Sequence, residues 1–231
     1  MGETVKITTP DGEFSAYVAR PAAARAPAMV VIQEIFGVNK IMRDIADAYA
    51  ADGYLAICPD LFWRLEPGVD ITDQSEAEWK KAFELFNAFD VDLGVRDIAA
   101  TIAQIRADPG CAGRAGAVGF CLGGLLAFLT ATRTDIDASV GYYGVGIERR
   151  LAEADKLTAP LLLHIAENDQ FVPKEAQALI LAALKNHPHV DIYTYPGRDH
   201  AFARKGGEHY DAADAVTANA RTLAFFQKAL A

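Results

Sequence analysis

The sequence has no apolar stretch of about 18 residues, which is the length that a membrane-spanning helix requires. Its first residues, Met1 to Lys6, also lack the basic segment and the apolar segment of a secretory signal peptide. These two absences argue against a membrane partner and against export. We therefore expect a cytoplasmic protein.

Positive charge is scarce as well, because 22 lysine and arginine residues stand against 31 aspartate and glutamate residues, for a net charge of -9. A surface of this sign repels the phosphates of nucleic acids and of anionic lipids. It does not exclude a small anionic substrate, since the potential inside a cleft can differ in sign from the total. The expected partner is therefore a small molecule, with no nucleic acid and no membrane, and the acidic surface favours a monomer.

Cysteine is rare, and its three copies, Cys58, Cys111 and Cys121, show neither the spacing of a metal site nor a Cys-x-x-Cys redox pair. We expect Cys58 in a strand and Cys111 in a turn, both reduced and structural. The sequence therefore predicts no metal site, and it leaves Cys121 as the cysteine whose surroundings indicate chemistry.

Linkers, repeats and low-complexity tracts are absent too, so the chain is predicted to form one domain over residues 1–231. With 52% hydrophobic residues, it can build a large core. Short apolar segments alternate with helical patterns, and Asp11-Gly12 separates two alternating segments, which is a strong hairpin signal. This order predicts an α/β fold with a doubly wound, mainly parallel sheet and an N-terminal β-hairpin at its edge.

The expected elements follow from hydrophobic period and from turn residues. The strands are expected over residues 5–9, 14–20, 28–33, 55–58, 115–120, 138–143, 160–165 and 190–195. The helices are expected over residues 40–52, 76–89, 91–106, 124–131, 174–185 and 212–230. Residues 62–77, which contain Pro67-Gly68 and many charges, are expected to form a loop that crosses toward the active face.

The pentapeptide Gly119-Phe120-Cys121-Leu122-Gly123 follows an expected strand and precedes an expected helix. In this context the Gly-x-nucleophile-x-Gly pattern indicates the nucleophile elbow of an α/β-hydrolase, where a sharp turn lifts the nucleophile above the edge of the sheet. Cysteine stands here where serine is usual. The alternative is a chance match around a buried structural cysteine.

The other members of a catalytic triad follow in the order that this fold requires, the acid and then the histidine. Asp169 follows the expected strand 160–165, and His200 follows the expected strand 190–195. Loops at the carboxyl ends of parallel strands meet at one crevice, so we expect both side chains there. Taken alone, Asp169 could cap its own loop and His200 could be a surface histidine. Asp199 is a rival acid, although sequence neighbours seldom face each other.

These residue types suit acyl transfer through sulfur. A free thiol has a pKa of about 8.5, so Cys121 needs a neighbouring imidazole to become a thiolate at neutral pH. His200 would stabilise the thiolate or take its proton, and Asp169 would hold the imidazole in the required tautomer. The developing oxyanion is expected to accept hydrogen bonds from the backbone N–H groups of Leu122 and Ile35.

Several longer motifs resemble the dienelactone hydrolase family nearly end to end. They are Gln33 to Asn39, Cys58 to Leu61, Gly119 to Gly124, Gly141 to Gly146 and His200 to Arg204. The resemblance implies a cofactor-free α/β-hydrolase that opens the lactone ring of dienelactone, 4-carboxymethylenebut-2-en-4-olide, to maleylacetate during the catabolism of aromatic compounds. It also implies a catalytic triad made of Cys121, Asp169 and His200.

The resemblance implies a role for two charged residues in substrate binding and thiol activation. Glu34 matches a glutamate that contacts the resting thiol, and Arg204 matches an arginine that binds this glutamate and the substrate carboxylate. A substrate carboxylate that engages Arg204 would release Glu34 to accept the thiol proton. The alternatives are a carboxylate at a helix start for Glu34 and a solvated surface cation for Arg204.

The aromatic residues include one departure from the family. A second arginine that binds the substrate carboxylate in the family corresponds to Trp79 here, and an indole cannot replace a guanidinium group. One of the two lysines that follow it could compensate in part, the pocket could accept a different acid, or Trp79 could pack in the core. Tyr142, Phe36 and Phe83 could line the pocket or could be ordinary packing residues.

Functions of other classes remain open at this level. The same scaffold suits a carboxylesterase or a thioesterase that acts on another small acid. A noncatalytic binding module would keep the pocket without turnover, although the intact set of Cys, Asp and His argues against it. A redox sensor at Cys121 would need a resolving partner, and the sequence has no Cys-x-x-Cys pair.

Overall fold

The structure is a computed structural model, and it describes residues 2–231. The chain divides into two compact units, Met1–Ala117 and Val118–Ala231. Strands alternate with helices in both units, which is the α/β class that the sequence predicts. The single domain expected for residues 1–231 stays a prediction.

The first unit begins with an antiparallel hairpin of β1 (Glu3–Thr9) and β2 (Gly12–Ala19), as the Asp11-Gly12 signal predicts. β2 is antiparallel to β4 (Leu55–Pro59), and β4 is parallel to β3 (Ala26–Ile32). The strand order in this unit is β1-β2-β4-β3-β5. Its helices are α1 (Lys40–Ala51), α2 (Glu76–Ala88) and α3 (Val91–Ala107).

The starts of these three helices are set by capping side chains. Asn39 accepts a hydrogen bond from the N–H of Met42 at the start of α1, and Ser75 accepts one from Glu78 at the start of α2. Asp90 caps α3 in the same way. Such caps satisfy N–H groups that have no partner within the helix. The helix starts therefore agree with the prediction to the residue.

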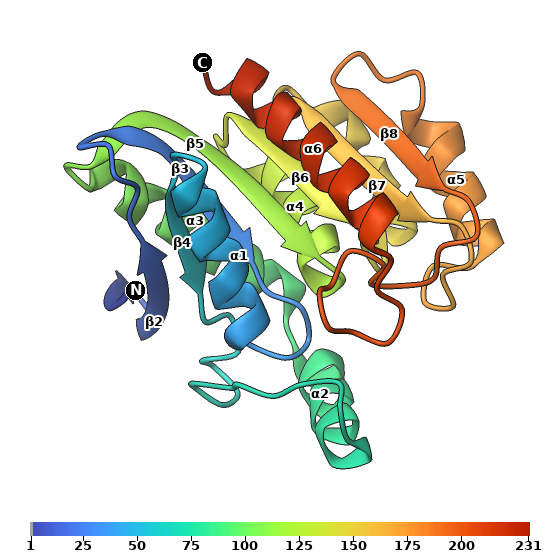
Figure 1. The fold of residues 1–231 in the computed structure, drawn as a ribbon, viewed down its shortest axis with the longest axis horizontal. Coiled ribbons are helices and arrows are strands. Elements are labelled where there is room, and N and C mark those ends of the chain that lie inside the picture. Colours follow the sequence, from blue (N-terminus) through green and yellow to red (C-terminus); the bar gives the residue numbers. More distant parts are fainter. Residues whose placement is uncertain (1) are drawn as a thin grey trace. The chain divides into compact units, whose positions relative to one another are not determined.

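The second unit contains the elements that follow the predicted elbow. They are α4 (Leu122–Arg133), β6 (Ala138–Tyr142), β7 (Leu161–Ala166), α5 (Lys174–Leu184), β8 (Val190–Tyr195) and α6 (Ala212–Ala229). The strand order is β5-β6-β7-β8, and β7 is parallel to both of its neighbours. Figure 1 shows α6 across one face of β6 and β7, with α4 and α5 behind the strands. Helices on both faces explain why every residue of β7 is buried.

The strand β5 (Cys111–Phe120), which crosses the boundary between the units, differs from its prediction. The apolar pattern predicted a start at Ala115, because the three residues after Cys111 are exposed and show no apolar run. Cys111 therefore begins a strand, and the turn expected for it is wrong. Two 3-10 helices, Ile147–Arg149 and Leu151–Lys156, were also not predicted, since such short helices have no amphipathic period.

The three cysteines are all free and buried. Cys58 lies in β4, as predicted, and its burial, together with the charge of Asp60, raises the pKa of its thiol. Among residues 2–231, no helix combines the length and the apolar character needed to cross a membrane. The same residues form no cluster of three or more His, Cys, Asp or Glu side chains that could hold a metal ion.

Candidate active site

Cys121 lies at the turn between β5 and α4, with backbone angles of φ 56° and ψ -114°. A positive φ is unusual for a residue with a Cβ and costs roughly 1–3 kcal/mol. Backbone hydrogen bonds from both the N–H and the carbonyl of Cys121 hold this conformation. The N–H of Cys121 donates to the carbonyl of Tyr142 (3.1 Å), and the N–H of Gly124 donates to the carbonyl of Cys121 (2.9 Å). Cys121 is 8% exposed, so it keeps a small opening to solvent.

The glycines of the turn allow backbone atoms to approach closely. A Cβ at position 119 would lie 1.9 Å from the carbonyl oxygen of Gly123. A Cβ at position 124 would lie 2.6 Å from the carbonyl oxygen of Tyr142. Neither Gly119 nor Gly124 has a positive φ, so space rather than backbone angle requires glycine there. The pattern in the sequence therefore marks a strained strand-to-helix turn.

The structure brings Asp169 and His200 together. Nδ1 of His200 lies 2.7 Å from Oδ2 of Asp169, and both residues are buried. The other carboxylate oxygen of Asp169 accepts the N–H groups of Phe171 (2.8 Å) and Val172 (3.2 Å). Asp199, the rival acid, instead accepts the backbone N–H of His200 at 2.7 Å. The carboxylate that is hydrogen-bonded to the imidazole is therefore that of Asp169.

The loops that carry Asp169 and His200 are connected through their backbones. The N–H of Asn168 donates to the carbonyl of Arg198 (2.7 Å), and the N–H of Glu167 donates to the carbonyl of Tyr195 (3.1 Å). The side chain of Glu167 also accepts the N–H of Gly197 at 3.0 Å. These three bonds place the acid and the histidine in a fixed geometry, because they join the ends of β7 and β8 immediately before the two side chains.

His200 is enclosed by two aromatic rings, those of Tyr143 and Phe171, whose centroids lie 5.0 Å and 4.9 Å from that of the imidazole. Its Nε2 atom is buried and has no hydrogen-bond partner of standard geometry within residues 2–231. Burial alone would lower the pKa of His200. A thiolate at Cys121 and the hydrogen-bonded Asp169 outweigh burial and raise the pKa to about 10. The raised pKa favours a protonated imidazole at neutral pH.

The two residues predicted to supply oxyanion donors lie in different units. Leu122 is the first residue of α4, so its N–H is one of the helix N-terminal donors that have no partner within the helix. Ile35 follows β3 in the first unit and is buried. The joint action of the two N–H groups stays a prediction.

Glu34 and Arg204 are both almost completely buried, at 2% and 6% exposure. Glu34 follows β3 and lies six residues before the start of α1 at Lys40, so it is not at a helix start. Arg204 lies in the loop after His200 and is not a solvated surface cation. Burial of a charge is costly unless it is paired or hydrogen-bonded, and both alternatives raised by the sequence are therefore excluded. The exchange of partners that the resemblance implies stays a prediction.

Trp79 belongs to an aromatic cluster of the first unit. Its ring lies 5.1 Å from that of Phe36 in an edge contact and 5.5 Å from that of Phe83 in a stack. Its indole N–H donates to the carbonyl of Asp73 at 3.0 Å, so this donor is already used by the backbone. Lys81, one of the two lysines considered as a substitute, forms an ion pair with Glu66. Neither side chain reproduces a free guanidinium group.

Tyr142 packs in the interior of the second unit. Its ring stacks on that of Phe120 at 4.7 Å. Its hydroxyl lies 2.6 Å from Oγ1 of Thr222 and 3.0 Å from Oδ1 of Asn219, both in α6. The contacts of Tyr142 are thus those of a packing residue. Its backbone matters more to the site, because its carbonyl accepts the N–H of Cys121.

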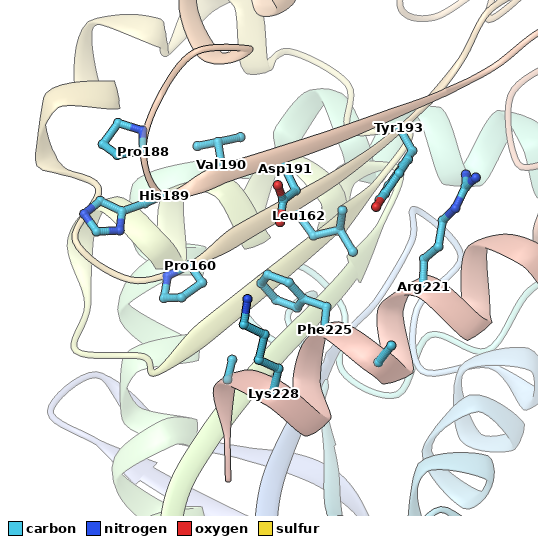
Figure 2. Close-up of a pocket in the computed structure, with 12 residues that line it drawn as sticks. Pro160, Leu162, Pro188, His189, Val190, Asp191, Tyr193, Arg221, Phe225 and Lys228 are labelled. Carbon is cyan, nitrogen blue, oxygen red and sulfur yellow. The ribbon is translucent and has the colours of Figure 1, made fainter.

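A surface pocket of about 560 Å³ lies between β7, β8 and α6. Figure 2 shows residues that line it, among them Tyr193, Arg221 and Lys228. Cys121, Asp169 and His200 do not line this pocket, so it is separate from the candidate active site.

Sequence comparison identifies relatives over nearly the whole chain. A model described as the dienelactone hydrolase family matches residues 14–230. A putative carboxymethylenebutenolidase of Azospirillum brasilense is 54% identical over 224 residues, which cover 95% of each chain. A carboxymethylenebutenolidase of Pseudomonas putida is 41% identical over 226 residues, which cover 97% of this chain and 96% of the relative.

Solved structures show the same architecture. A putative dienelactone hydrolase from Klebsiella pneumoniae superposes with a TM-score of 0.86 at 28% identity, and the alignment covers 98% of each chain. An acylaminoacyl peptidase from Pyrococcus horikoshii superposes with a TM-score of 0.71 at 18% identity, over 98% of this chain and 41% of that one. At 18% identity, the superposition on the peptidase shows similarity of fold alone. Together with the element order, these structures show the predicted α/β-hydrolase fold.

Proposed function

The chain belongs to the dienelactone hydrolase family, and from this premise we propose that it opens the lactone ring of dienelactone to give maleylacetate. It is a hydrolase of lactones or esters. The observation that carries the proposed mechanism is the 2.7 Å hydrogen bond between His200 and Asp169, in the same unit as the strained turn at Cys121. We further propose that the enzyme acts as a cytoplasmic monomer in the catabolism of aromatic compounds.

In the first step, the thiolate of Cys121 attacks the lactone carbonyl. The C–S bond forms, the ring C–O bond breaks, and the substrate leaves as an enolate that remains attached through its acyl group. The N–H groups of Leu122 and Ile35 donate to the oxyanion of the tetrahedral intermediate. The enolate is a good leaving group, because its charge is delocalised. It takes the proton of the His200 imidazolium and becomes the ketone of maleylacetate, which leaves the imidazole neutral.

In the second step, neutral His200 takes a proton from water, and the resulting hydroxide attacks the thioester carbonyl. The C–S bond then breaks, maleylacetate is released as a carboxylate, and Cys121 leaves as a thiolate beside the protonated imidazole. The charge of Cys121 is one cause of the raised pKa of His200, and acylation of the sulfur removes that charge. The imidazole then loses its proton more easily, so it can act as the base for hydrolysis. Asp169 keeps the same nitrogen of the ring hydrogen-bonded throughout.

The burial of Glu34 and Arg204 supports a substrate-controlled thiol. In the proposed switch, the carboxylate of the substrate engages Arg204, and Glu34 then accepts the proton of the Cys121 thiol. A reactive thiolate would form only when an anionic substrate is bound. This arrangement would protect the sulfur from oxidation between turnovers.

The second candidate function is hydrolysis of esters or thioesters of another small acid. Trp79 favours this function, because it stands where the family has a second arginine for the substrate carboxylate. Its indole N–H already donates to the carbonyl of Asp73, so Trp79 cannot take over that role. Steady-state kinetics with cis-dienelactone, trans-dienelactone and p-nitrophenyl acetate distinguish the two functions. A higher kcat/KM for a dienelactone supports the first, and a higher kcat/KM for the plain ester supports the second.

A further inference from the structure

A chain of hydrogen bonds runs through the interior of the second unit, beneath α6. It contains Arg221, Tyr195, His164, Thr222, Tyr142 and Asn219 in this order. The successive distances are 3.2 Å, 2.7 Å, 2.9 Å, 2.6 Å and 3.0 Å. The four central residues are all buried. The chain connects α6 to the last residues of β6 and β8 and to His164 in β7.

The ends of this chain and a neutral His164 together set the direction in which it donates. At one end, the guanidinium group of Arg221 can only donate, so the hydroxyl of Tyr195 accepts from it and keeps its own proton for Nδ1 of His164. A neutral ring that accepts at Nδ1 carries its proton on Nε2 and donates it to Thr222. At the other end, Oδ1 of Asn219 can only accept, so Tyr142 donates to it and Thr222 donates to Tyr142. With a neutral His164, this is the arrangement that places a proton in every contact of the chain.

This arrangement requires a neutral His164. Burial, with the charge of Arg221, lowers the pKa of His164 to about 3, so the ring stays neutral near neutral pH. Arg221 is held by a second contact, because its guanidinium group lies 4.1 Å from the ring centroid of Tyr193. Figure 2 shows Arg221 reaching from α6 toward Tyr193 at the end of the pocket.

Two members of the hydrogen-bond chain, Tyr142 and Tyr195, contact the candidate active site through their backbone carbonyls. The carbonyl of Tyr142 accepts the N–H of Cys121 (3.1 Å). The carbonyl of Tyr195 accepts the N–H groups of Glu167 (3.1 Å) and Arg198 (3.2 Å), which belong to the loops that carry Asp169 and His200. The buried chain thus fixes the two strand ends, β6 and β8, from which the nucleophile turn and the acid and histidine loops are held.

We propose that Tyr195, His164 and Thr222 are positioning residues for hydrolysis, because their one-way hydrogen-bond chain sets the separation of the Cys121 turn from the Asp169 and His200 loops. None of the three touches the reacting atoms in this mechanism. The inference rests on the proposed function, since it assigns these residues to the geometry of the proposed triad.

The kinetic test removes one hydroxyl at a time. Thr222→Val keeps the shape of the side chain and removes its hydroxyl, and Tyr195→Phe does the same for Tyr195. Both variants are expected to lower kcat about tenfold or more, with KM within about twofold, because a small displacement of catalytic groups is costly while substrate contacts remain. Thr222→Ser restores the hydroxyl and should restore kcat.

Tyr193→Phe is the matched control, since it removes a hydroxyl from the same strand outside the chain. Its kcat is expected to equal that of the wild type. An unchanged kcat in folded Thr222→Val and Tyr195→Phe, or an equal loss in Tyr193→Phe, would overturn the proposal.

A measurement on the wild-type protein is independent of activity and of variant folding. The ¹⁵N chemical shifts of His164 report which ring nitrogen carries the proton, and we expect Nε2–H. The opposite tautomer would contradict the hydrogen-bond chain. The proposed function has its own test: it fails if Cys121→Ala retains full hydrolytic activity. That result would not change the tautomer of His164, so the two failures can be told apart.

Discussion

The carboxylate of Asp169 is oriented by its own loop before it reaches His200. One oxygen accepts the backbone N–H groups of Phe171 and Val172, and the other lies 2.7 Å from Nδ1 of His200. A carboxylate held in this way does not need to reorganise when charge develops on the imidazole. The relationship gives Asp169 the orienting role in the proposed mechanism.

Asp169→Asn is expected to lower kcat by a factor on the order of 10³–10⁴, because an amide favours the wrong tautomer of the imidazole. Asp199→Asn is the matched control, since Asp199 accepts the backbone N–H of His200 and lies 3.7 Å from the ring of His209, whereas Asp169 is the acid that is hydrogen-bonded to the imidazole of His200. Its kcat should fall by less than about tenfold. Steady-state kinetics with one lactone measure both, and a larger loss in Asp199→Asn would contradict the assignment.

The pKa of His200 should depend on the sulfur of Cys121. Cys121→Ala removes one cause of the raised pKa, so an NMR titration of the imidazole should give a pKa below the value of about 10 expected for the wild type. An unchanged pKa in Cys121→Ala would show that the sulfur does not face the ring.

The same raised pKa predicts a dependence of stability on pH. The pKa of His200 in the folded protein is about 10 and exceeds the ordinary value of 6.5. Its contribution to the free energy of unfolding is therefore fully present below pH 6.5 and is lost as the pH rises through about 10. Denaturant titrations across this range should show a smaller decline in Cys121→Ala than in the wild type.

Gly119→Ala tests the close packing at the turn. The added Cβ would lie 1.9 Å from the carbonyl oxygen of Gly123, so backbone atoms must move. We expect a loss of about 3 kcal/mol or more in the free energy of unfolding. Gly68→Ala is the control, because φ is +76° there and the added Cβ would meet no other group of the described residues within 4 Å. Backbone strain alone is expected to lower its free energy of unfolding by about 1 kcal/mol. Equal losses in the two variants would contradict a steric requirement at position 119.

Arg204→Gln tests recognition of the substrate carboxylate. The variant should lose kcat/KM on carboxylate-bearing lactones by about 10²-fold, because a charge-assisted hydrogen bond is removed. The loss on p-nitrophenyl acetate should be much smaller, since this ester has no carboxylate. Equal losses on both substrates would argue that Arg204 supports the fold rather than the substrate.

Much of the fold could be predicted, because its signals are local. Asn39, Ser75 and Asp90 mark three helix starts, and each acts through hydrogen bonds to residues two or three positions away. The start of β5 could not be predicted in this way. The residues after Cys111 are exposed, and their strand character comes from pairing rather than from an apolar pattern.

The candidate site also combines features that the sequence predicts with features that it does not. The order of Cys121, Asp169 and His200 is visible in the sequence, because the fold places strand ends at one crevice. The hydrogen-bond partners of His164 could not be predicted from the sequence. A histidine within an apolar strand indicates a buried polar contact, but Thr222 lies 58 residues away in α6, and no local pattern connects the two positions.

The proposed mechanism depends on a thioester at Cys121, which intact-protein mass spectrometry can detect. His200→Asn mixed with cis-dienelactone, which carries a carboxylate, should accumulate one acyl group of the substrate, because hydrolysis of the thioester is slowed. Peptide mapping should place that group on Cys121. Acylation of another residue, together with unimpaired hydrolysis by Cys121→Ala, would contradict the mechanism.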